Sequence, residues 1–227
     1  MAINSGRTRL NLAPLDQIGW LADQPEEFRQ WVATVAEWRN YDGGKPIYLA
    51  GDPSDGLYGL ASGALELTFP LIGEEPISIY RAEVGFWAGD SAELSDEPRL
   101  ITLSAASDCR LLHIPHSAIR ARLADQPLDW QCYYRLSHRN VKTAVTLLAE
   151  SLALSVRARV CRRLLKLTEA SAETRLTHEQ LAKFLGLTRT TVSEELRRLS
   201  AKGALDTGYG RIRVLDRAIL ERYKEEQ

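Results

Sequence analysis

The chain has 227 residues, of which 44% are hydrophobic and 26% are charged, with 15 glycines and 9 prolines. This composition is typical of a globular protein with one large or two small domains, and it excludes a chain that needs disulfides or a metal to fold. No apolar run approaches the ~18 residues of a membrane span, and the opening residues lack the apolar segment of a signal peptide. We therefore expect no membrane partner.

The three cysteines, Cys109, Cys132 and Cys161, are far apart and odd in number, which excludes a disulfide scaffold and favours a reducing cytoplasm. The net charge of −1 is the sum of two unlike halves. Residues 1–124 hold 10 Lys+Arg and 17 Asp+Glu, a charge of −7, whereas residues 125–227 hold 19 and 13, a charge of +6. Chance clustering of solvated side chains is one interpretation. The other is an acidic module joined to one that meets a polyanion.

The first 40 residues are expected to be helical, because large apolar side chains recur there at helical steps: Trp20, Phe28, Trp31, Val35 and Trp38. From Gly43 to about Pro115, short alternating runs are separated by Gly- and Pro-rich turns. These runs cover residues 47–50, 57–61, 64–69, 77–82, 99–105 and 109–115. Six or more short strands predict a small sandwich or barrel.

After Pro127 the pattern becomes helical, with a heptad-like stripe made of Tyr134, His138, Val141, Val145, Leu148, Leu152 and Ser155. The stripe predicts a long helix that either pairs with a second copy or faces the protein's own core.

Residues 177–200 predict two short helices joined by a tight turn. Thr177 and Gln180 form a capping box, Gly186 permits a sharp turn, and Thr188 caps the second helix, in which Val192 points inward. This is the spacing of a helix-turn-helix. Residues 202–216 add a predicted strand-turn-strand with its tip at residues 208–210, which completes a winged helix.

Such a helix fits the major groove of DNA, and its first exposed residues meet base edges. Arg189 matches a guanine, Glu194 matches a cytosine amino group, and later cations suit phosphates. The candidate DNA-binding residues are Thr177, Thr188, Arg189, Thr190, Thr191, Ser193, Glu194, Arg197, Arg198, Lys202, Arg211 and Arg213. Residues 156–217 hold 14 basic and 7 acidic residues, which favours DNA over a protein partner. The acidic Glu195 stands at a normally apolar position, and the sequence does not explain it.

The helix-turn-helix and the segment GDPSDGLYGLASGALEL, residues 51–67, together resemble the CRP/FNR superfamily of bacterial transcription regulators. The resemblance implies an α+β protein in three parts. These are an effector-sensing β-roll or jelly roll of the cyclic nucleotide-binding type (1–124), a dimerisation helix (125–155) and a winged helix-turn-helix (156–227). It also implies a homodimer that reads a palindromic operator in double-stranded DNA and works with RNA polymerase. The implied dimer seam contains Tyr134, Val141, Val145, Leu148 and Leu152.

The family's phosphate-binding cassette aligns with residues 88–101. The resemblance implies an effector pocket at Gly89, Asp90, Arg99 and Leu100, in which the family's Glu contacts ribose and its Arg-Ser pair holds the cyclic phosphate. Here Asp90 replaces that Glu and Leu100 replaces that Ser, so a hydrogen-bond donor is lost, while Glu93 adds negative charge. We therefore expect no ordinary cyclic-AMP binding, with Arg99 paired to Asp90 or Glu93. The alternative is a regulator that binds cyclic AMP or cyclic GMP through Arg99.

No cofactor or catalytic residue is evident, and an enzyme is not expected. The family's iron-sulfur branch needs four cysteines grouped mainly near the N-terminus, which this chain lacks. His113, His116 and Cys109 are haem-ligand candidates by residue type alone, and a cupin-type metal enzyme would need an H-x-H core. An unknown small-molecule effector remains open. We expect the core, rather than an apolar pocket, to hold Trp20, Trp31, Trp38 and Trp87.

Overall fold

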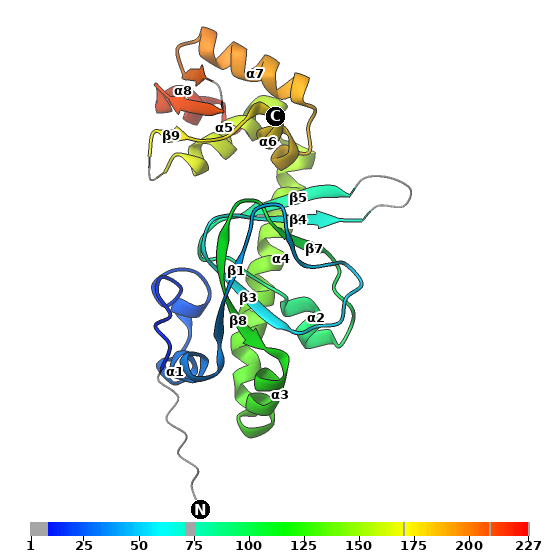
Figure 1. Cartoon of the computed structure of the whole chain (residues 1–227). Helices are drawn as coiled ribbons and strands as arrows, with labels where there is room; N and C mark the ends of the chain where they lie inside the picture. The colour runs from blue at the N-terminus through cyan, green and yellow to red at the C-terminus, as the bar shows by residue number, and fades with distance from the viewer. Residues whose placement is uncertain (1–8, 71–75, 170, 209, 227) are drawn as a thin grey trace, which may run out of the picture. The chain divides into compact units, whose positions relative to one another are not determined.

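The computed structural model describes residues 9–70, 76–169, 171–208 and 210–226, and the chain divides into two compact units (Figure 1). The first unit is Met1–Val141 and the second is Lys142–Gln227. The boundary falls inside the longest helix, α4 (Trp130–Ala153). The contacts therefore divide the chain in two, and a separate dimerisation segment at 125–155 stays a prediction.

The first unit is mostly β-structure with short helices around it. Its strands are β1 (Glu37–Tyr41), β2 (Pro46–Tyr48), β3 (Gly56–Ser62), β4 (Leu65–Phe69), β5 (Ile77–Ala82), β6 (Trp87–Ala88), β7 (Thr102–Ala105) and β8 (Cys109–Pro115). Its helices are η1 (Leu21–Asp23), α1 (Glu26–Val35), α2 (Asp90–Ser95), α3 (His116–Asp125), η2 (Pro127–Asp129) and the start of α4.

Two antiparallel four-stranded sheets form this unit, in the orders β1-β8-β3-β6 and β2-β7-β4-β5. Their inner faces share one hydrophobic core, to which β3 gives Leu60 and β4 gives Leu65. A second core covers the other face of the first sheet with residues from α1, α3 and α4, such as Phe28, Ile119 and Tyr133. Because β3 is covered on both faces, six of its seven residues are buried. The predicted sandwich and the α+β class are confirmed.

The prediction that the first 40 residues are helical is correct only for η1 and α1, because residues 9–20 form turns and irregular backbone and β1 begins at Glu37. Residues 1–8 lie outside the described part. Trp38 lies in β1, where it pairs with Leu112 of β8. The position of Trp38 fits the helical spacing of the apolar residues before it. Its backbone nevertheless forms a strand, because β8 supplies hydrogen-bond partners for the backbone groups of this edge segment. Helices α2 and α3 were not indicated by the sequence patterns. Trp20 and Trp87 are fully buried, and Trp31 and Trp38 pack partly buried against the same core.

The described part of the second unit begins with the end of α4 and contains four further helices and a small sheet. These are α5 (Val156–Leu167), β9 (Glu173–Thr174), α6 (His178–Leu185), α7 (Arg189–Ala201), β10 (Leu205–Gly208), β11 (Arg211–Val214) and α8 (Arg217–Tyr223). The sheet has the order β10-β11-β9, and its hairpin joins Leu205 to Val214. The core combines α5, α6, α7 and the hairpin through residues such as Leu164, Ala182, Val192 and Ile212.

The long helical run expected after Pro127 is broken at one point. Helix α4 ends at Ala153, and Ser155 caps α5 by accepting a hydrogen bond from the Ala158 N–H at 3.2 Å. Ser155 therefore belongs to the junction between two helices and lies outside the stripe predicted for α4.

Candidate DNA interface and effector site

Local capping sets the geometry of the helix-turn-helix as predicted. Thr177 and Gln180 form a reciprocal capping box at the start of α6. Gly186 ends α6 with a φ of +59°, a left-handed conformation that glycine adopts without a Cβ penalty. The Thr188 hydroxyl then accepts a hydrogen bond from the Thr191 N–H at 3.1 Å and begins α7. Two threonines among the predicted DNA-binding residues thus serve as helix caps.

The face of α7 that carries its first residues is exposed. Val192, Leu196 and Leu199 are buried in the core, and the exposed polar and charged residues of this helix are Arg189, Thr190, Glu194, Arg197 and Arg198. Ser193 is partly buried, with its hydroxyl 2.9 Å from Nδ1 of His178. Burial, and next the charge of Arg189, lower the pKa of His178, so its ring is neutral near pH 7.

Two predicted cations beyond α7 have partners inside the unit. Lys202 donates from Nζ to the Tyr223 hydroxyl at 3.0 Å. Arg211, on the hairpin, pairs with Asp206 at 3.2 Å and Glu173 at 3.7 Å. Arg211 is still 45% exposed, so its guanidinium remains accessible to a phosphate. Arg213 is also exposed, and Tyr209 at the predicted tip lies outside the described residues.

Residues from one side of α4 form a line of large apolar groups on the surface. Tyr134, Val141, Val145, Leu148 and Leu152 are between 57% and 80% exposed. The predicted stripe therefore does not face the protein's own core, which was one of its two interpretations.

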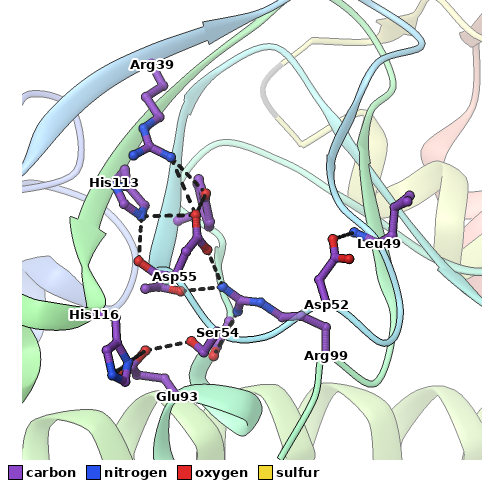
Figure 2. A network of polar contacts seen from close by, with 12 residues as sticks. Arg39, Leu49, Asp52, Ser54, Asp55, Glu93, Arg99, His113 and His116 are labelled. Carbon is purple, nitrogen blue, oxygen red and sulfur yellow. Dashed lines mark hydrogen bonds and ion pairs between the residues drawn. The ribbon is translucent and has the colours of Figure 1, made fainter.

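In the first unit, the cassette arginine is held by the protein itself. Arg99 has a side chain that is 1% exposed, and Nη2 donates to Asp55 Oδ1 at 2.7 Å and to the Gly56 carbonyl at 2.9 Å. Nη1 donates to the Gly89 carbonyl at 3.2 Å, and the guanidinium carbon lies 4.2 Å from the Tyr48 ring centre. The expected pairing with Asp90 or Glu93 is wrong, because the carboxylate that pairs with this guanidinium is that of Asp55, from the loop before β3 (Figure 2).

Asp55 is the centre of a polar network in which Arg39, Arg99 and His113 converge (Figure 2). Tyr58 also belongs to this network. The Tyr58 hydroxyl donates to Asp55 Oδ2 at 2.5 Å and accepts from Arg39 at 3.0 Å. Burial alone raises the pKa of Asp55, but the hydrogen bonds from Tyr58 and Arg99 outweigh it, so the pKa lies below its ordinary value. Asp55 is therefore a carboxylate at neutral pH. Sequence reasoning missed its role, although it lies in the turn cluster between the first and second predicted strands.

The other cassette residues are also engaged within the unit. Gly89 has a φ of +105°, and a Cβ there would lie 2.5 Å from Arg99 Nη1, so glycine permits the close approach. Asp90 is buried and accepts hydrogen bonds from Ser137 and Asn140 of α4 at 2.7 Å each. Burial raises the pKa of Asp90 above its ordinary value, although those two hydrogen bonds act to lower it. Leu100 is 63% exposed, so its side chain points out to solvent.

Glu93 and the two histidines named as ligand candidates make separate contacts. Glu93 accepts from Ser54 at 2.6 Å and lies 3.0 Å from Nδ1 of His116. His113 is buried, with Nδ1 3.3 Å from Glu37 and Nε2 3.1 Å from the Asp55 carbonyl. Within the described residues, no three or more His, Cys, Asp or Glu side chains are grouped to hold a metal. Among the described helices, none combines the length and the apolar character that a membrane crossing requires.

Comparisons with known proteins match both units. The cyclic nucleotide-binding domain family matches residues 38–126, and the Crp-like helix-turn-helix domain family matches residues 158–223. The "Cyclic AMP receptor protein" of Thermus thermophilus is 29% identical over 185 residues, which cover 81% of this chain and 86% of that protein.

Solved structures share the fold. FixK2 from Bradyrhizobium japonicum aligns with a TM-score of 0.74 at 19% identity, over 85% of this chain and 99% of that one. A CRP/FNR-family transcriptional regulator from Thermus thermophilus aligns with a TM-score of 0.70 at 22% identity, over 84% and 99%. The fold and the matches define a regulator with a domain of the cyclic nucleotide-binding family and a Crp-like helix-turn-helix domain. The chain belongs to the CRP/FNR family of transcription regulators, which is not a family of enzymes.

Proposed function

We propose that this regulator acts as a cytoplasmic homodimer that binds a palindromic operator through α7 and the β10–β11 hairpin, without ordinary recognition of cyclic AMP. The exposed first turn of α7 is the observation that carries the DNA-binding part. Arg189 and Thr190 lie outside the core, at the positions from which a helix in the major groove contacts base edges. The cations that follow on α7 suit phosphates on either side.

The dimer is inferred from the exposed stripe on α4. Five large apolar side chains in one line on one helix lose solvent contact when a second copy packs against them, and each Å² of apolar surface removed stabilises by about 25 cal/mol. Two-fold symmetry would set the two α7 helices about 34 Å apart, one turn of DNA. The family supports a further step, in which the bound dimer acts on RNA polymerase.

The absence of ordinary cyclic-AMP recognition is inferred from Arg99. Its guanidinium already donates to a carboxylate and two carbonyls, so a cyclic phosphate would have to displace the Asp55 carboxylate. Displacement leaves a negative Asp55 beside a second anion, which is unfavourable at short range. The exposed Leu100 offers no donor in compensation.

Selection of bound fragments from a genomic DNA library with purified protein tests this function. We expect one palindromic site, with half-sites one helical turn apart, bound in the absence of any nucleotide. Fluorescence anisotropy at fixed salt should give the same Kd, within a factor of ten, with and without cyclic AMP or cyclic GMP. A larger effect would favour the alternative of a cyclic nucleotide bound through Arg99. Failure to recover any DNA would contradict the DNA-binding proposal.

A further inference from the structure

Helix α7 carries one buried charge on the face that packs into the core. Glu195 is 4% exposed and stands among Val192, Leu196 and Leu199. Arg157 of α5 donates from Nε to its Oε1 at 2.6 Å, and Arg198 donates to its Oε2 at 3.2 Å. Both carboxylate oxygens therefore accept hydrogen bonds, which explains how an acidic residue can occupy a position that is normally apolar.

Arg157 connects this carboxylate to the C-terminal segment. It lies in the first turn of α5, and its Nη1 donates to Glu226 Oε1 at 3.2 Å. Its guanidinium carbon lies 5.0 Å from the centre of the Tyr223 ring. The hydrogen bond to Glu195, the largest contribution, raises the pKa of Arg157, so the guanidinium is always charged.

The same C-terminal segment contacts the junction between α4 and α5. The Ser155 N–H, at the junction itself, donates to the Glu226 carbonyl at 2.9 Å. Arg162 donates from Nε to the Lys224 carbonyl at 2.6 Å and pairs through Nη1 with Glu150 of α4 at 3.0 Å. A continuous set of hydrogen bonds therefore runs from α7 through Arg157 to the junction.

We propose that Glu195 is a positioning residue, which with Arg157 fixes the rotation of α7 relative to the α4–α5 junction and thereby the half-site spacing that the dimer reads. A buried ion pair is no more stabilising than apolar side chains of similar volume, so stability alone does not account for a charge here. Apolar contacts tolerate sliding and rotation, whereas the charge-assisted hydrogen bond from Arg157 of α5 to Glu195 of α7 has a fixed direction. The inference rests on the proposed function, because it needs α7 to enter DNA.

The experiment compares folding and operator choice in the full chain. The double variant Arg157→Met with Glu195→Leu replaces both charges by apolar side chains, which avoids leaving either one buried and unpaired. The probe is the operator recovered by the unaltered protein from a random-sequence duplex library, together with versions whose half-sites are one base pair closer or further apart. We expect an unfolding midpoint close to that of the unaltered protein, operator binding at least tenfold weaker, and a reduced preference among the three spacings.

A second variant keeps the test decisive if the double variant fails to fold. Arg157→Lys keeps a positive charge beside Glu195, so no buried charge is left unpaired, but it loses the planar guanidinium that donates to both Glu195 and Glu226. We expect the same reduced spacing preference. Glu179→Gln is the matched control, because its ion pair with Lys183 on α6 is long, at 3.9 Å, and exposed. This control should bind and discriminate as the unaltered protein does.

The outcomes separate the two proposals. A folded double variant that binds and discriminates spacing like the unaltered protein overturns the positioning role while leaving the DNA-binding function intact. If the double variant is unfolded, the same result from Arg157→Lys overturns it. Recovery of no DNA by the unaltered protein overturns both.

Discussion

Arg99 and Asp55 form an ion pair in which one partner is buried and the other is half-exposed. The Arg99 side chain is 1% exposed and that of Asp55 is 50% exposed, with 2.7 Å between Nη2 and Oδ1. The carboxylate comes from the loop before β3, 44 residues away from the arginine in sequence. The protein thus neutralises a buried cation with its own carboxylate.

Replacement of Asp55 by alanine should destabilise the first unit. Arg99 would be left buried without a carboxylate, and because Asp55 is half-exposed and solvent-screened, we expect a loss of about 1–3 kcal/mol rather than the full cost of breaking a buried pair. Chemical denaturation followed by tryptophan fluorescence measures it. Glu97→Gln, at an exposed position in the cassette loop, serves as control. Equal stability of Asp55→Ala and this control would contradict a structural role for the pair.

The stability of the first unit should fall as the pH falls through 6.5. Burial, and next the charge of Arg39, lower the pKa of His113 from its ordinary value of 6.5. Between the lowered pKa and 6.5 the unfolded chain binds a proton that the folded protein does not, so stability is complete above 6.5 and declines below it. Denaturation midpoints of the unaltered chain and His113→Gln, measured across this range, should show a shallower pH slope for the variant. Identical slopes would refute the assignment.

Arg189→Ala should weaken operator binding and relax selectivity at one guanine. A bidentate contact to guanine contributes about 1–3 kcal/mol of discrimination, so the loss of affinity should be confined to the cognate site. Competition against operators substituted at each position measures it. Arg197→Ala is a useful comparison, since loss of a phosphate contact should weaken all duplexes alike and reduce the salt slope by about 1. If base discrimination by Arg189→Ala is unchanged, the residue does not read a base.

Leu148→Asp should separate the homodimer. The substitution places a charge in the exposed apolar stripe, where a second copy would have to bury it. Sedimentation velocity should show a monomer, and operator affinity should fall at least tenfold because one half-site contact is lost. Thr146→Asp, exposed on α4 but outside the stripe, should remain dimeric. A dimeric Leu148→Asp chain would place the interface elsewhere.

The sequence by itself determined the features that depend on residues a few positions apart. The capping box of Thr177 and Gln180, the left-handed Gly186 and the cap at Thr188 all appear in the structure as predicted. Each is a local competition between a side chain and nearby backbone groups, so neighbouring residues are sufficient to decide it. The alternating strands were predictable for the same reason, since period two follows from the backbone itself.

Only the tertiary structure decided which distant partner each buried charge has. Arg99 pairs with Asp55, and Glu195 pairs with Arg157, 38 residues before it. Trp38, which fits a helical spacing, lies in a strand because β8 supplies its backbone partners. A buried charge needs an opposite charge within about 3 Å. Which residue provides it depends on how whole strands and helices pack against one another. Sequence spacing carries no information about that distance once the chain has turned back on itself.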